Sequence, residues 1–132
     1  MDFRKMKLEE GQKYTVVFYD GLIGIVSMQI TLVDYYVSNY AQYEDCLHLE
    51  MKVGRRKYIT EQVFMPNAPL LIIKGAKKIN FDSLYDIEET QNAVIKQSKI
   101  FSQSIKWIEC AYEQVEKEDI VFYSEDKEKL NA

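Results

Sequence analysis

Residues 24–32 read Gly24-Ile25-Val26-Ser27-Met28-Gln29-Ile30-Thr31-Leu32, and this stretch decides the fold. Apolar and polar side chains alternate along it. The apolar positions are Val26, Met28, Ile30 and Leu32, and the polar ones are Ser27, Gln29 and Thr31. A period of two is typical of a β-strand with one buried and one solvated face. The sequence therefore predicts a sheet here.

Further strands are predicted on both sides of this stretch. Residues 13–19 are rich in β-branched and aromatic side chains, which favour strands. In residues 47–53 the alternation returns, with His48, Glu50 and Lys52 on the outward face. A short turn that contains Gly54 leads to a strand over 58–64, so these two strands should form a hairpin. The short apolar run 70–73 and residues 79–81 complete a strand-rich region over 13–81.

The pattern changes after Asp82, where apolar residues recur at helical spacing. The stripe runs through Val94, Ser98, Phe101, Ile105, Ile108, Tyr112 and Val115, and the polar Ser98 interrupts it. Spacings of three and four place these positions on one face of a helix. We predict a helix at about 86–117 whose stripe packs on the domain's own sheet. A return strand should follow at 120–123, and a frayed, charged tail at 124–132.

Length and composition set the class of the protein. The 132 residues, 47% hydrophobic and 29% charged, are typical of one compact domain over 1–132. We predict an α+β fold: a small, mainly antiparallel β-barrel or curved sheet with one long C-terminal amphipathic helix. Only two cysteines, no signal-peptide pattern and no membrane-length apolar run predict a cytoplasmic protein with no membrane association.

Charge is distributed unevenly along the chain. Residues 1–51 carry eight acids and four bases, residues 52–78 one acid and seven bases, and residues 79–132 twelve acids and six bases. The middle of this acidic protein, with net charge −4 overall, is therefore a basic island with net charge +6.

Two turns, at residues 54–57 and 74–78, hold most of the bases of the basic island, and we take them as the candidate binding site. The residues of this candidate site are Arg55, Arg56, Lys57, Tyr58, Lys74, Lys77 and Lys78. Cations beside an aromatic ring suit nucleic acid, because they neutralise phosphates while the ring stacks on bases. The alternative is that these charges only keep exposed turns soluble.

A second candidate region is the tyrosine-rich segment 35–45. Tyr35, Tyr36, Tyr40 and Tyr43 lie in what the sequence presents as a polar, irregular connection. Such loops often carry binding function, although tyrosines also fill the ends of a β-core.

No reaction is indicated by the residues. Cys46 and His48 should share the outward face of a strand, but they bring no oxyanion-hole signature. Paired carboxylates and nucleotide-binding motifs are not recognisable either. We therefore predict a protein that is not an enzyme, with no catalytic residues, no metal site and no cofactor.

In its size, its strand-dense residues 13–81 and its basic turns 54–57 and 74–78, the chain resembles PUA-like small β-barrel proteins, an RNA-associated fold family. Within that family it looks like the PrgU-type regulators of enterococcal pheromone-responsive plasmids. The resemblance implies a compact barrel and a regulatory role. The acidic helix and tail differ from a typical RNA-binding member of this family.

Two functions follow as expectations. The leading one is a small, non-enzymatic regulatory binding protein that contacts single-stranded RNA through the basic turns. The alternative is a plasmid- or phage-type inhibitor or adaptor that binds a host protein through the acidic helix and the tyrosine-rich segment. The charge split separates them, because RNA should bind the basic island and a basic protein the acidic parts. The sequence leaves the oligomeric state open.

Overall fold

The computed structural model describes residues 2–21, 24–80 and 97–126, with the backbone alone for residues 97–103. Six strands form one antiparallel sheet in the order β4-β3-β2-β1-β5-β6. The strands are β1 (Lys13–Asp20), β2 (Gly24–Tyr40), β3 (Tyr43–Val53), β4 (Thr60–Phe64), β5 (Leu70–Lys74) and β6 (Ile120–Tyr123). The helices are the short η1 (Phe3–Lys5) and η2 (Lys117–Asp119) and the α-helix α2 (Gln97–Glu113).

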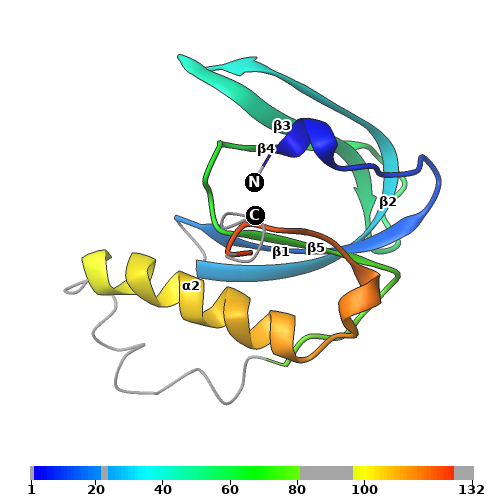
Figure 1. Ribbon diagram of the computed structural model, residues 1–132. Helices are drawn as coiled ribbons and strands as arrows, with labels where there is room; N and C mark the ends of the chain where they lie inside the picture. Colours follow the sequence, from blue (N-terminus) through cyan, green and yellow to red (C-terminus); the bar gives the residue numbers. More distant parts are fainter. Residues whose placement is uncertain (1, 22–23, 81–96, 127–132) are drawn as a thin grey trace.

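The longest strand, β2, gives the sheet its shape. Residues 24–31 of β2 pair with β1, whereas residues 30–40 pair with β3. A register shift between Leu32 and Asp34 separates the two halves. Such bulges bend a strand and increase its twist. The sheet therefore folds over itself into two facing layers, as Figure 1 shows.

The main hydrophobic core lies between the two layers. Phe18 of β1 meets Phe64 of β4 edge-on, with ring centroids 5.2 Å apart. The N-terminal segment closes one side, because Phe3 of η1 packs against Phe122 of β6 at 4.9 Å. This cluster also contains Leu32, Leu49, Met51, Leu70 and Ile72, all at most 1% exposed.

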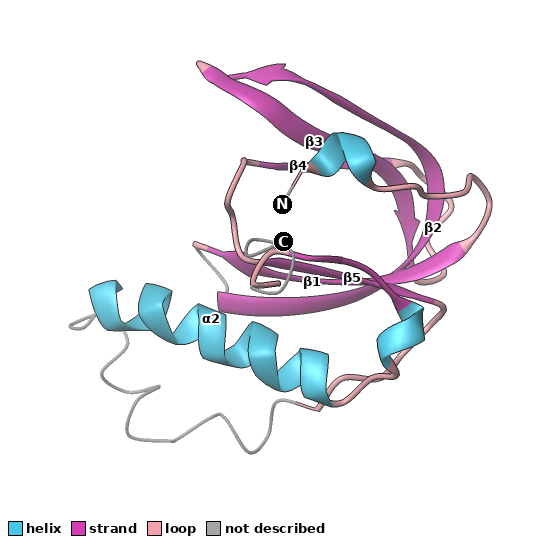
Figure 2. Ribbon diagram, viewed as in Figure 1, coloured by secondary structure: helices cyan, strands magenta, loops and turns pink. Residues whose placement is uncertain are grey.

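A second core lies on the other face of β1, β5 and the first half of β2, where α2 docks. Ile108 and Ala111 of the helix are fully buried against Val17, Leu71 and Ile73. Figure 2 shows α2 on the side of the sheet away from β3 and β4. The helix thus packs on its own domain's sheet, as the stripe predicts. The outer face of β3 and β4 lies away from this helix.

The structure decides between the two predicted forms of the sheet and corrects two further predictions. Of the predicted barrel or curved sheet, the curved sheet is found: it is open, with edges at β4 and β6, and does not close into a barrel. The tyrosine-rich segment 35–45 is not an irregular loop: it forms the end of β2, a two-residue turn and the start of β3. Strand β4 begins at Thr60, so Tyr58 and Ile59 belong to the turn.

The C-terminal predictions are also revised. The helix ends at Glu113 instead of near 117, and residues 86–96 of the predicted helix lie outside the described residues. The return strand over 120–123 is confirmed as β6, which pairs with β5. Ile79 and Asn80 are not in a strand, and Phe81 lies outside the described residues. Ser124, expected in a frayed tail, is held by two hydrogen bonds to the backbone of Leu70.

Candidate functional site

The two basic turns meet at one end of the sheet. The strand register aligns Val53, Ile30, Tyr14 and Lys74 in one row across β3, β2, β1 and β5. Because neighbouring strands lie about 4.8 Å apart, the ends of β3 and β5 are roughly 15 Å apart when measured along the curved sheet.

Gln29 of β2 joins the two turns directly. Its carbonyl oxygen accepts from the N–H of Gly54 at 2.8 Å, and its side-chain amide donates to the carbonyl oxygen of Lys77 at 3.3 Å. Gly54 and Gly75, the first residues of the two turns, have φ of 57° and 87°. Glycine adopts this left-handed conformation at little cost, so both chains can reverse abruptly at the same end of the sheet.

A buried threonine holds the second turn in place. The hydroxyl of Thr15, which is fully buried, donates to the carbonyl oxygen of Gly75 at 2.8 Å. The hydroxyl oxygen of Thr15 also accepts from the N–H of Lys77 at 2.7 Å. One side chain of β1 thus satisfies two backbone groups of the turn, which fixes its path over the sheet.

Most of the candidate residues are exposed at this end of the sheet, but one of them is engaged in an ion pair. Arg55, Arg56, Lys57, Lys74 and Lys78 are exposed, and Tyr58 is 60% exposed. The guanidinium of Arg56 lies 5.8 Å from the centre of the Tyr58 ring. Lys77 differs, because its ammonium group pairs with Asp119 at 3.2 Å.

The strand register places two further cationic side chains near the two basic turns, and neither was among the candidate residues. Lys13 and Lys52 lie opposite Thr31 from its two neighbouring strands, and both are exposed. Lys13 is far from the basic island in sequence, so only the pairing of β1 with β2 reveals its position. We use the name basic end for this set. Its members are Lys13, Lys52, Arg55, Arg56, Lys57, Tyr58, Lys74 and Lys78.

The other candidate region, the tyrosine-rich hairpin, covers His48 on the outer face of β2 and β3. His48 was predicted to point into solvent, but it is only 5% exposed. Tyr36 stacks on its ring at a centroid distance of 4.5 Å, and Tyr40 meets it edge-on at 6.0 Å. Tyr36, Tyr40 and Tyr43 remain 40%, 48% and 55% exposed. Burial, followed by the charges of Glu61, Glu50 and Asp34, raises the pKa of Tyr36.

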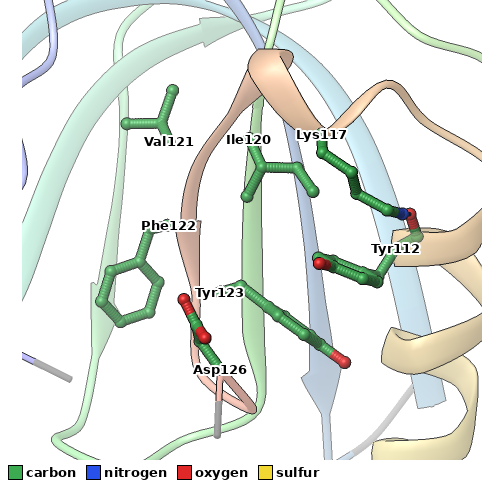
Figure 3. A pocket seen from close by; sticks show the side chains of 7 residues that line it. All are labelled: Tyr112, Lys117, Ile120, Val121, Phe122, Tyr123 and Asp126. Carbon is green, nitrogen blue, oxygen red and sulfur yellow. Dashed lines mark hydrogen bonds between the residues drawn. The ribbon is translucent and has the colours of Figure 1, made fainter. Parts of the chain in front are cut away.

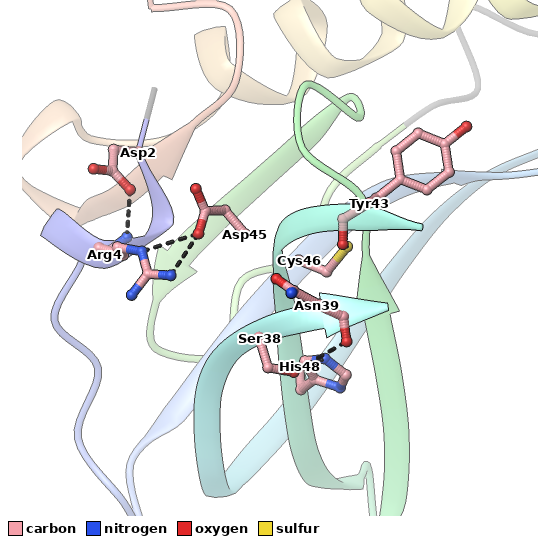
Figure 4. Close-up of polar contacts among 8 residues, drawn as sticks. All are labelled: Asp2, Arg4, Ser38, Asn39, Tyr43, Asp45, Cys46 and His48. Carbon is pink, nitrogen blue, oxygen red and sulfur yellow. Dashed lines mark hydrogen bonds and ion pairs between the residues drawn. The ribbon is translucent and has the colours of Figure 1, made fainter. Parts of the chain in front are cut away.

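The imidazole of His48 has two different surroundings. Its Nε2 forms a hydrogen bond with the hydroxyl of Ser38 at 2.9 Å, as Figure 4 shows. Its Nδ1 lies 3.6 Å from the carboxylate of Glu61, which is beyond hydrogen-bond range. Nδ1 is buried and has no hydrogen-bond partner.

Cys46 is also on this face, but it is fully buried. Its sulfur contacts the carbonyl oxygen of Tyr43 at 3.7 Å and the sulfur of Met65 at 3.6 Å. A reactive thiolate needs access and a nearby positive charge. These surroundings instead fit an inert, structural cysteine.

The N-terminal segment is tied to the tip of the hairpin. Asp2 accepts from the backbone N–H of Arg4 at 2.8 Å, and the guanidinium of Arg4 pairs with Asp45 (Figure 4). Asp45 has φ of 57° beside the second register shift of the β2–β3 pair. This contact holds η1 at the end of β3 opposite the basic turn.

A small pocket lies between α2, η2 and β6 (Figure 3). Its volume is about 190 Å³. Tyr112 stacks on Tyr123 at 4.2 Å, and the ammonium group of Lys117 sits 3.6 Å from the centre of the Tyr112 ring. Burial raises the pKa of Tyr123. The pocket is smaller than the roughly 300–1,000 Å³ of typical small-molecule sites, and its lysine is already engaged.

No family model matches the chain, and no curated protein or solved structure matches it either. Among the described residues, no helix is long and apolar enough to cross a membrane. The described residues also contain no cluster of three or more His, Cys, Asp or Glu side chains that is arranged to hold a metal ion.

Proposed function

We propose that this protein is a non-enzymatic regulatory binding protein that holds single-stranded RNA at the basic end. The observation that carries this proposal is the convergence of two basic turns, separated in sequence, on Gln29. Convergence turns scattered charges into one surface, which is what a phosphate backbone requires.

Tyr58 makes single-stranded RNA the preferred partner. It is 60% exposed and lies within the basic end, beside Arg56. Unpaired bases can stack on such a ring, whereas the bases of a duplex are already stacked on each other. The surface therefore combines phosphate neutralisation with one stacking position.

The rest of the charge distribution limits the footprint. Asp34, Glu50 and Glu61 lie at facing positions on β2, β3 and β4, and the whole chain carries net charge −4. Like charges repel the phosphate backbone beyond the basic end. We therefore expect a short binding site and a strong dependence on salt.

Fluorescence anisotropy with a labelled single-stranded RNA, measured at several salt concentrations, tests the proposal. Replacing Arg55 and Arg56 together with Ala should flatten the dependence of log affinity on log salt by roughly one to two phosphate contacts. Tyr58→Ala should instead weaken binding by about 1–3 kcal/mol with little change in salt slope, because a stacking contact releases no counterion.

The matched control is Lys5→Ala with Lys7→Ala, which also removes two positive charges, at exposed lysines of the N-terminal segment outside the basic end. It should leave the salt slope nearly unchanged. Absence of binding by the wild-type protein at low salt, where the electrostatic contribution is largest, would refute the RNA proposal and favour a protein partner.

A further inference from the structure

Three carboxylates lie in one row on the outer face of the sheet. Asp34 of β2 is directly opposite Glu50 of β3, and Glu50 is directly opposite Glu61 of β4. We call these three residues the acidic row. Like charges at directly opposite positions of neighbouring strands destabilise a sheet. Among the described residues, no lysine or arginine forms an ion pair with the row.

A buried nitrogen faces one end of this row. His48 Nδ1 is without a hydrogen-bond partner and lies 3.6 Å from Glu61 Oε1. An unpartnered buried polar atom is costly, so its position needs a cause.

The contact with Ser38 occupies the other nitrogen of the His48 ring. The Ser38 hydroxyl lies 2.9 Å from Nε2, and its oxygen can accept the ring hydrogen when Nε2 carries it. In that tautomer Nδ1 carries a lone pair directed toward the carboxylate of Glu61. Two acceptors then face each other, and a cation between them would satisfy both.

The distance fits a metal ion better than a hydrogen bond. Zinc binds imidazole nitrogen at about 2.0–2.1 Å and carboxylate oxygen at about 2.0–2.2 Å, so two tetrahedral ligands are roughly 3.4 Å apart. The 3.6 Å between Nδ1 and Oε1 is close to this separation. We propose that His48, Glu50 and Glu61 form a site for a divalent transition metal such as zinc.

The backbone places Glu50, the third proposed ligand, close to His48 and Glu61. His48 and Glu50 are two residues apart on β3 and therefore share its outer face. Glu61 lies across from Glu50 on β4, so the three side chains form a triangle on two neighbouring strands. The site is not preassembled in the described residues, and the Glu50 carboxylate must turn toward the other two ligands. Imidazole in this set favours zinc or cobalt over magnesium or calcium.

Titration of the chelator-treated full-length protein with cobalt chloride, followed by visible absorption, tests the site. Cobalt in a protein site of low coordination number gives absorption bands, and zinc chloride should remove them by competition. Glu61→Gln should weaken cobalt binding on the order of tenfold or more, because even changes outside the ligand set cost 10–100-fold. Glu50→Gln should also weaken it.

Glu44→Gln is the matched control, because Glu44 is an exposed glutamate of the same strand. It should bind cobalt as the wild type does. His48→Asn tests the nitrogen ligand, and circular dichroism establishes whether this variant is folded; the two glutamate variants test the site independently of it. No cobalt spectrum in the wild type, or an unchanged affinity in both Glu61→Gln and Glu50→Gln, would overturn the metal-site proposal.

Discussion

At the scale of single residues, Thr15 shows how a small side chain can position a functional surface. It lies in β1 beneath the turn that begins at Gly75, and it bonds both Gly75 and Lys77. Nothing about a threonine in a β-branched run marks it as special, because the valines beside it have the same shape and strand propensity. Its role depends on residues 60 and 62 positions away in sequence.

Thr15→Val should lower the free energy of unfolding by about 1–3 kcal/mol. The substitution preserves shape but leaves the part-buried N–H of Lys77 and carbonyl oxygen of Gly75 without this partner. Urea denaturation measures the change. Thr31→Val, at a half-buried threonine on the neighbouring strand, should stay within about 0.5 kcal/mol of wild type. Equal losses in the two variants would contradict the assigned role of Thr15.

At the scale of elements, the strands with clear alternation were predictable and the tyrosine-rich hairpin was not. Residues 24–32 and 47–53 repeat at a period of two, and both stretches lie in strands. The turn of the hairpin, Ala41-Gln42, contains no glycine, asparagine or proline, so it carries no turn signal. Tyrosine favours strands, and this preference extends β2 to Tyr40.

The helix shows a different limit of pattern reading. Its buried positions include Ser104 and Ala111 beside Ile108. Neither Ser104 nor Ala111 belongs to the large apolar stripe that predicted the buried face. Small residues can let a helix approach a sheet closely, but an apolar pattern does not distinguish them from solvent-exposed positions.

The Ala41-Gln42 turn offers a prediction at this scale. Both residues have positive φ, 47° and 71°, which suits a type I′ hairpin turn but strains residues with a Cβ. Replacing the pair with Asn-Gly should raise the free energy of unfolding by roughly 0.5–2 kcal/mol. Urea denaturation measures the gain. Unchanged or reduced stability would show that this turn is not strained in solution.

At the scale of the whole molecule, the sequence revealed the basic island but not the surface it forms. The charge of residues 52–78 is plain from composition, and two turns could be expected there. That they meet follows from β5 pairing with β1 while β3 pairs with β2, which is a property of strand order. The same strand order adds Lys13 to the basic end. It also places the three members of the acidic row opposite one another on neighbouring strands.

The two hydrophobic cores share β1, β2 and β5, so damage to one should destabilise the whole chain. Ile108→Ala should lower the free energy of unfolding by about 2–5 kcal/mol, because Ile108 is fully buried between α2 and the sheet. Thermal and urea unfolding measure the loss. The exposed neighbour Lys106 is the control, and Lys106→Ala should change stability by less than about 0.5 kcal/mol.

The same experiment distinguishes an internal core from an interface between two copies. A helix docked on its own sheet gives a melting temperature that does not depend on protein concentration. A melting temperature that rises with concentration would place Ile108 at a subunit interface instead. The predicted stripe residue Phe101 is not a suitable probe, because its side chain lies outside the described residues.

The strand order also has a consequence for how the chain reaches its native state. β1 to β4 form a meander in which each strand pairs with the next, so their contacts close short loops. β5 must instead return past three strands to pair with β1, joining Tyr14 to Lys74. Loop-closure entropy makes such non-local pairing slow. We expect the meander to form early and the arrival of β5, followed by β6, to limit the folding rate.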